Sequence, residues 1–451
     1  MLSFLKHGNP TFEHGIHPEE HKERTHFRRI LRMPFSKHYI LPLEQHIGKP
    51  SVPIVRKGQK VKKGEKIAEA DGMVSVALHS PVDGVVSKIG LIVGPRGVEQ
   101  NAIIIDLDYY SSQQFKAAHI VDPEKLDFKE FISHVQGAGI VGLGGAAFPA
   151  HVKFSIPPGK KCESIILNGC ECEPFLTSDD RLMTEHPEEV IDGLVILGKQ
   201  LGVKDLAIAI EDNKPAAIEA LQNASEAMKA DVKVLALKTK YPQGAEKMMI
   251  TALTGKEVPS GALPIDLGVL VSNVGTSVAL SNYFRTGIPL IERVITVTGD
   301  QLSKPSNLWV PLGTGLDELI RFSGGDPGQI DQVILGGPMM GMVQKRLNIP
   351  VIKGTSGVLA NRPLEEFVNI QSCIRCGRCI DACPLFLNPA RLGLMSRKKL
   401  WEEMDEYHVM DCFECGSCSY VCPSNIPLVQ NFRVAKGFIR ERKSKMVNKT
   451  L

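Results

Sequence analysis

The chain has 451 residues, which exceeds what one hydrophobic core supports and predicts about three or four domains. Its composition is that of ordinary globular proteins, and a net charge of +3 is too small to indicate a nucleic-acid partner. No stretch approaches the roughly 18 to 20 apolar residues that span a bilayer. The first ten residues lack the apolar core of a secretory signal, so we expect a cytoplasmic, thiol-rich protein.

Residues 1–35 are rich in histidine: His7, His14, His17, His21 and His26. Imidazoles are good metal ligands, but this spacing matches no standard zinc pattern and no cysteine lies nearby. We therefore favour a solvated or docking segment over a metal site.

Residues 36–112 alternate short β-rich runs with turns. The run at 80–86 contains Asp83-Gly84, a pair typical of tight turns. The pattern resembles the barrel-sandwich hybrid of biotinyl and lipoyl carrier domains. Those domains present a modifiable lysine at a hairpin tip. The turn at Asp83-Gly84 has none, which favours a scaffold role.

Residues 113–290 are predicted to form an α/β domain. A helical repeat of apolar residues covers 128–135. Asn213 as N-cap, with Pro215 in the first turn, predicts another helix that runs to about residue 229. Buried strands are predicted at 165–167, 206–210, 232–237 and 269–271. Strands that alternate with helices indicate a parallel sheet covered on both faces.

Residues 291–355 return to β character, with strands at 293–298 and 333–335 and a helix at 316–322, and fit a small β-grasp domain. Residues 360–451 form the last predicted domain. There Asn388 as N-cap and Pro389 at the first helical position predict a helix over residues 390–409. This last domain is therefore expected to be helical.

Eight of the eleven cysteines lie in that domain, in two copies of the spacing C-x2-C-x2-C-x3-C-P. The two runs are Cys373, Cys376, Cys379, Cys383 and Cys412, Cys415, Cys418, Cys422. This spacing holds 4Fe-4S clusters in bacterial ferredoxins, where the fourth cysteine of each run ligates the other cluster. We therefore expect one cluster on Cys373, Cys376, Cys379 and Cys422, and another on Cys412, Cys415, Cys418 and Cys383. Zinc sites or disulfides are the weaker alternatives.

A glycine-rich loop lies at 137–149. Gly137 to Gly142 is a literal GxGxxG, but a helical pattern precedes it, whereas a Rossmann fingerprint needs a strand there. Gly142, Gly144 and Gly145 with the nearby Lys153 instead suit a loop whose backbone N–H groups close on a phosphate or a flat ring.

Three other segments are predicted at strand ends: 168–174, 241–247 and 272–276. Open α/β sheets bind ligands at the carboxyl ends of their strands. Together with the glycine-rich loop, these segments outline one pocket, and Cys170 and Cys172 are expected to line it.

In these four segments the chain resembles the FMN- and NADH-binding subunit of respiratory complex I. The shared motifs are the loop ending in Phe148-Pro149, Asn168 to Pro174, Tyr241 to Glu246, and Asn273 to Thr276. The chain departs from that family at Cys170 and Ala245. The resemblance implies that FMN is bound by Gly142, Gly144, Gly145, Lys153, Asn168, Glu171, Asn273 and Thr276. It also implies that Glu173 and Glu246 line the nicotinamide side.

Over nearly its whole length the chain resembles the RnfC subunit of the Rnf electron transport complex, including Gly15 to Pro18 and His21-Lys22. This resemblance implies an oxidoreductase and ion-translocase component, peripheral on the cytoplasmic side of the membrane. Its FMN would pass electrons between NAD(H) and two 4Fe-4S clusters. The implied partners are other subunits, including an iron–sulfur subunit, and ferredoxin indirectly. The alternatives are a cobalamin reductase, whose flavin domain tends to come first, and a non-catalytic electron wire.

Overall fold

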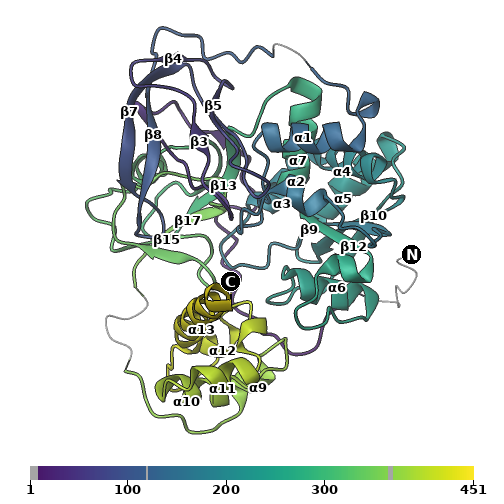
Figure 1. Ribbon diagram of the computed structural model, residues 1–451, viewed down its shortest axis with the longest axis vertical. Helices are drawn as coiled ribbons and strands as arrows, with labels where there is room; N and C mark the ends of the chain where they lie inside the picture. Colours follow the sequence, from purple (N-terminus) through teal and green to yellow (C-terminus); the bar gives the residue numbers. More distant parts are fainter. Residues whose placement is uncertain (1–8, 118–119, 364–368, 451) are drawn as a thin grey trace.

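The computed structural model describes residues 9–117, 120–363 and 369–450, so His7 lies outside the described residues. Figure 1 shows the β-rich barrel beside the α/β domain, the β-grasp strands below the barrel, and the cysteine-rich domain at the lower end. Within the described part of the chain, no helix is both long and apolar enough to cross a membrane.

The barrel consists of two antiparallel sheets. The first has the order β2-β8-β7-β4 and the second β3-β5-β6. The strands are β2 His38–Pro42, β3 Val52–Pro53, β4 Lys60–Val61, β5 Lys66–Glu69, β6 Leu78–His79, β7 Gly84–Val93 and β8 Glu99–Leu107. Gly84 opens β7 and does not form the centre of a hairpin turn. A Cβ there would lie 2.4 Å from the Asp106 carbonyl oxygen, which explains the glycine.

The α/β domain has a wholly parallel sheet with the order β11-β10-β9-β12. Its strands are β9 Ser164–Gly169, β10 Asp205–Glu211, β11 Val232–Leu237 and β12 Val269–Asn273. Its helices are α1 Phe128–Gly137, α2 Ala150–Phe154, α3 Ser178–Glu185, α4 Pro187–Leu201, α5 Pro215–Ala227, α6 Glu246–Thr254 and α7 Val274–Thr286, with short 3-10 turns η1 Pro123–Lys125 and η2 Pro264–Leu267.

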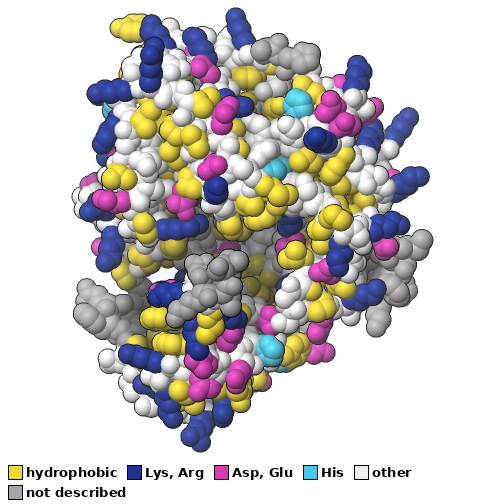
Figure 2. Space-filling model, in the orientation of Figure 1, with side chains coloured by type: hydrophobic (Ala, Val, Ile, Leu, Met, Phe, Trp, Pro, Cys, Tyr) yellow, Lys and Arg dark blue, Asp and Glu magenta, His cyan; other side chains and the backbone are white. Residues whose placement is uncertain are grey.

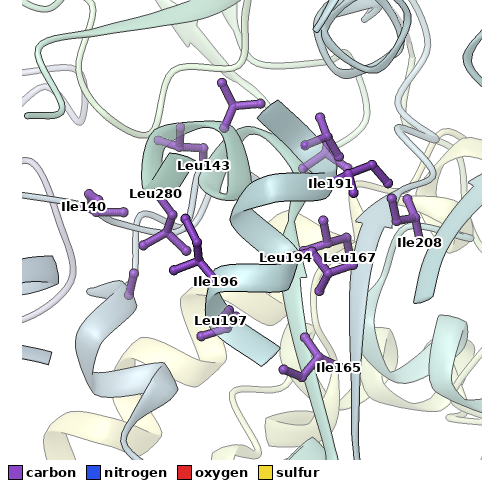
Figure 3. Packing of buried hydrophobic residues seen from close by; sticks show 14 of the residues in the cluster. Ile140, Leu143, Ile165, Leu167, Ile191, Leu194, Ile196, Leu197, Ile208 and Leu280 are labelled. Atoms are coloured by element: carbon purple, nitrogen blue, oxygen red, sulfur yellow. The ribbon is translucent and has the colours of Figure 1, made fainter. Parts of the chain in front are cut away.

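Apolar side chains alternate between the two faces of this sheet because successive strand residues point to opposite sides. Leu167 and Ile208 pack against α4, and Figure 3 shows Leu194 of this helix beside Leu167. Ile166 packs on the opposite face in a cluster with Met249 of α6. Both faces are thus covered, as the strand–helix alternation predicts.

The prediction that Asn213 caps α5 is wrong. The cap position is Lys214, without a side-chain cap bond. The Asn213 amide instead donates to Glu20 at 2.7 Å, and its oxygen accepts from the Lys214 ammonium at 2.8 Å. A partner from the N-terminal segment, distant in sequence, therefore takes the side chain away from the helix.

The β-grasp domain is a six-stranded sheet with the order β1-β14-β13-β17-β15-β16. Its strands are β1 Leu31–Arg32, β13 Glu292–Thr298, β14 Ser306–Pro311, β15 Gln332–Leu335, β16 Met342–Gln344 and β17 Gly357–Asn361, and its helix is α8 Leu316–Phe322. The edge strand β1 comes from the N-terminal segment and runs parallel to β14.

The N-terminal segment is not simply solvated. Its described part forms a strap over the other domains. Ile16 pairs through its backbone with Tyr241, and the Lys22 ammonium donates to the Leu176 carbonyl. Arg24 donates to the Leu302 carbonyl at 2.8 Å, and the His14 ring lies 3.1 Å from the Cys383 carbonyl oxygen. The strap therefore contacts the α/β, β-grasp and cysteine-rich domains.

A second link between domains is Lys353, which is fully buried. Its Nζ donates to the Ala77 carbonyl of the barrel at 3.0 Å and to the Gly139 carbonyl of the α/β domain at 2.6 Å. Burial lowers the pKa of this amine to about 7. A neutral amine has two N–H donors, which matches these two acceptors.

The cysteine-rich domain is helical, with α9 Arg378–Asp381, α10 Pro389–Arg397, α11 Trp401–Glu406, η3 Val409–Asp411, α12 Ser417–Tyr420 and α13 Leu428–Thr450. The Asn388 side chain accepts from the Arg391 N–H at 2.9 Å, which confirms it as the N-cap of α10. The predicted continuous helix to residue 409 is wrong, because α10 ends at Arg397 and Lys399 adopts a φ of 57° before α11 begins.

Candidate functional site

Two asparagines lie side by side at the carboxyl ends of neighbouring strands. Asn168 of β9 and Asn273 of β12 are register partners in the parallel sheet. The Asn168 amide donates to the Gly244 carbonyl at 2.8 Å. Asn273 caps α7 by accepting from the Gly275 N–H at 2.9 Å, and its amide donates to Asp179 at 2.7 Å. Both side chains are therefore fixed where a ligand at the sheet edge would sit.

The glycine-rich loop is held over the start of α7. Thr276 Oγ1 accepts from the Leu143 N–H at 2.9 Å, and the Gly142 N–H donates to the Phe148 carbonyl at 2.8 Å. A Cβ on Gly144 would meet Asn273 at 3.5 Å, and Gly145 has a φ of 107°, which favours glycine. The Thr276 hydroxyl is thus occupied in holding the loop.

An ion pair links the helix after the glycine-rich loop to the helix after Gly244. Lys153 Nζ lies 2.8 Å from Glu246 Oε1, and both side chains are about one-third exposed, at 33% and 34%. Lys153 is on α2, which follows the glycine-rich loop, and Glu246 opens α6, which follows Gly244. The structure therefore brings one set of predicted residues to a continuous rim: Gly142, Gly144, Gly145, Lys153, Asn168, Glu246, Asn273 and Thr276.

Glu171 is bonded to the start of α3, whose Asp179 in turn accepts from Asn273 of the rim. Its carboxylate accepts from the backbone N–H groups of Asp179 at 2.8 Å and Asp180 at 3.0 Å, at the start of α3. Its carbonyl accepts from the Lys22 ammonium of the strap at 2.8 Å. The carboxylate therefore organises the loop that follows β9.

Glu173 faces the β-grasp domain. Its carboxylate accepts from the Met339 N–H at 3.1 Å and the Met340 N–H at 2.9 Å. Burial raises its pKa to about 7. Cys170, which we expected to line the pocket, is fully buried in the sheet core. Cys172 does line this region, because its sulfur accepts from the Gly244 N–H at 3.2 Å.

The eight C-terminal cysteines surround two cavities. We call the first the distal cavity; its cysteines are Cys373, Cys376, Cys379 and Cys422. We call the second the proximal cavity; its cysteines are Cys383, Cys412, Cys415 and Cys418. Each cavity thus gathers the first three cysteines of one run and the last cysteine of the other. Sets of four thiolates suit 4Fe-4S clusters.

The proximal cavity borders the α/β domain. The Tyr241 hydroxyl, which is fully buried, donates to the Cys415 carbonyl at 2.6 Å. Tyr241 and Cys415 belong to one apolar cluster with Ile16 of the strap, and Cys172 and Met339 pack against it. Sequence reasoning placed Tyr241 in a motif but missed this contact, because only the fold brings residues 241 and 415 together.

The donor sets fit both cofactors. Gly144, Gly145 and Ala146 are exposed, and Gly144 lies against Asn273 at the N-terminus of α7, an arrangement suited to a phosphate. The proximal cavity borders the same domain through the Tyr241–Cys415 hydrogen bond. The fold and site together define a class of protein, the flavin and iron–sulfur electron-transfer proteins.

Comparison with known proteins resolves this class further. Residues 135–282 match the Nuo51 FMN-binding domain and residues 10–110 the RnfC barrel sandwich hybrid domain. Residues 294–343 match the SLBB domain and residues 369–426 the 4Fe-4S dicluster domain. These matches agree with the predicted architecture and with FMN and two 4Fe-4S clusters as cofactors.

Two curated relatives, both RnfC subunits, align along almost their entire length. The one from the proton-translocating ferredoxin:NAD(+) oxidoreductase complex of Clostridium ljungdahlii is 45% identical over 95% of this chain and 93% of its own. Its counterpart from the Na(+)-translocating complex of Acetobacterium woodii is 42% identical over 98% of this chain and 99% of its own. The chain therefore belongs to the RnfC family, a subunit of the ion-translocating ferredoxin:NAD(+) oxidoreductase complexes.

A solved structure shares the fold. A chain of the NAD+-reducing [NiFe]-hydrogenase in the H2-reduced state aligns with a TM-score of 0.51 and 18% identity, over 70% of this chain and 63% of the other. The cobalamin reductase alternative is set aside, because the barrel precedes the FMN domain and the relatives match from end to end.

Proposed function

We propose that this chain exchanges electrons with NAD(H) and passes them through FMN and two 4Fe-4S clusters, within a complex that couples NAD and ferredoxin chemistry to ion movement. The observation that carries the proposal is the contact between Tyr241 and Cys415, which sets the proximal cavity against the flavin domain. An electron route within one chain needs this adjacency.

FMN, when bound, converts hydride exchange with NAD(H) into single-electron steps. In this proposal Gly144 and Gly145 offer backbone N–H groups to the phosphate, and Lys153 supplies positive charge. Gly142 shapes the loop, because its N–H donates to the Phe148 carbonyl. Asn168 and Asn273 bond the ring or the ribityl chain. Thr276 holds the loop and Glu171 the segment after β9.

The proposed nicotinamide side carries Glu246 and Glu173. Glu246 is held by Lys153, which orients it at the rim. Glu173 is held by two backbone N–H groups of the β-grasp domain, so a displacement of that loop would move the carboxylate. These contacts support a positioning role for both acids toward NAD(H).

For the clusters we propose crossed ligation, with Cys373, Cys376, Cys379 and Cys422 on the distal cluster and Cys412, Cys415, Cys418 and Cys383 on the proximal one. The cavity linings support this assignment. We further propose a peripheral position on the cytoplasmic side of the membrane, with an iron–sulfur subunit of the complex as a direct partner and ferredoxin as an indirect one.

The test uses the full chain reconstituted with iron, sulfide and FMN. We expect one FMN and about eight irons per chain, with NADH-driven reduction of a dye. FMN and clusters without any NADH turnover would support the non-catalytic wire instead. A chain without flavin and with far fewer irons would contradict both.

A further inference from the structure

The distal cavity opens on an exposed face of its domain. Ile374 and Leu394, which line this cavity, are 68% and 45% exposed, and Cys376 is exposed as well. By contrast, Cys383, Cys415 and Cys418 of the proximal cavity are buried. We call the surface formed by Ile374, Arg375, Cys376, Arg378, Leu394 and Arg397 the distal face. It brings a thiolate ligand to the solvent, which shortens an electron route out of the chain.

The distal face is strongly basic. It carries three arginines, Arg375, Arg378 and Arg397, and no acid. The segment that contains it, residues 369–400, has six Lys or Arg and one acid, a net charge of +5. Figure 2 shows Lys and Arg side chains along the lower edge of this domain, where Figure 1 places α10. Within the described residues, Arg375, Arg378 and Arg397 form no ion pair.

The basic residues of α13 differ. Arg433 and Lys436 pair with Glu414, and Arg442 pairs with Glu402 of α11. Much of the positive charge on this helix is therefore paired inside the domain, whereas the three arginines of the distal face are not.

We propose that the distal face docks an acidic one-electron carrier domain, a refinement that rests on the proposed function. The arginines would steer the carrier electrostatically, and Ile374 and Leu394 would exclude water at the centre of contact. One electron then passes between the distal cluster and the carrier, so that one is oxidised as the other is reduced. An anionic membrane would satisfy the charge but could not accept an electron, which favours the carrier.

The probe is a photoreduced acidic two-cluster ferredoxin, which stands in for the carrier domain of the iron–sulfur subunit. NAD+ is the final acceptor and the reconstituted full chain is the catalyst. For Arg378→Glu/Arg397→Glu at low ionic strength we expect at least a tenfold lower rate with ferredoxin, with unchanged iron and FMN content and NADH-to-dye activity within twofold. Arg378→Lys/Arg397→Lys should retain the rate. The wild-type rate with ferredoxin should fall steeply with added salt, because the attraction is screened.

The matched control is Lys345→Glu/Arg346→Glu, an equal charge change on exposed residues of the β-grasp domain. An equal loss in this control, or no loss in the distal-face variant, overturns the proposal. So does a variant that loses only its binding to anionic phospholipid vesicles, which would assign the face to a membrane. A reconstituted wild-type chain without NADH-to-dye activity would instead overturn the proposed function.

Discussion

The hydrogen bonds of Thr276 give the sharpest prediction about the flavin site. Thr276 is 1% exposed, accepts from the Leu143 N–H at 2.9 Å and donates to the Val141 carbonyl at 3.3 Å. Thr276→Val keeps the shape of the side chain and removes the hydroxyl. The buried Leu143 N–H then lacks its partner, at a cost of about 1–3 kcal/mol.

That cost should appear in FMN affinity. Without FMN, the exposed loop can relax so that the Leu143 N–H reaches water, and FMN binding must then restore the anchored conformation. The dissociation constant of FMN should therefore rise about 5- to 150-fold. Titration of FMN into the flavin-free chain, followed by flavin fluorescence, measures this change.

Two variants control the experiment. Thr276→Ser keeps the hydroxyl and should bind FMN nearly as the wild type does. Ser277→Ala removes a buried hydrogen bond of similar length, 2.8 Å to the Val190 carbonyl, on another side of α7. It should lower stability without weakening FMN binding. A folded Thr276→Val chain that binds FMN within twofold of the wild type would refute the reasoning.

Three other predictions follow from the site and the interdomain contacts. Cys422→Ser should remove the distal cluster and Cys383→Ser the proximal one, each lowering iron from about eight to about four per chain; if electron paramagnetic resonance shows the opposite losses, the ligation is not crossed. Glu246→Gln should raise the KM for NADH about tenfold with FMN content unchanged, while stability changes by less than about 1 kcal/mol because the pair is part-exposed; an unchanged KM would remove Glu246 from the nicotinamide side. Since the folded pKa of Lys353 is lowered to about 7, the unfolded chain binds more protons between pH 7 and pH 10.5, so stability should rise with pH there, by at most about 1.4 kcal/mol per pH unit. The melting temperature of the wild type minus that of Lys353→Met should grow over this range, and a flat difference would contradict the assignment.

Much of this architecture could be predicted because its signals are local. The apolar runs at 165–167 and 206–210 appear as β9 and β10, and Asn388 caps α10 as predicted. The cysteine spacing indicates its cofactor without any knowledge of the fold. Each of these signals lies within a few residues of the element that it defines.

What could not be predicted depends on contacts between distant segments. Asn213 has the sequence features of a helix cap, but Glu20 competes for its amide. The carboxylate of Glu171 accepts from backbone N–H groups at the start of α3, a contact that its motif does not reveal. The role of Lys353 is likewise invisible in sequence, because its two acceptors, at residues 77 and 139, are more than 200 positions away.

The order of the two clusters is the most direct test of the account. It is measured by freeze-quench electron paramagnetic resonance after one turnover with NADH, in Cys376→Ser and Cys412→Ser chains. If the proximal cluster receives electrons from the flavin, the proximal cluster that remains in Cys376→Ser should become reduced as fast as in the wild type. In Cys412→Ser, FMN should become reduced at the normal rate, but the remaining distal cluster only slowly. The opposite pattern, with fast reduction in Cys412→Ser and slow reduction in Cys376→Ser, would contradict the route through Tyr241 and Cys415.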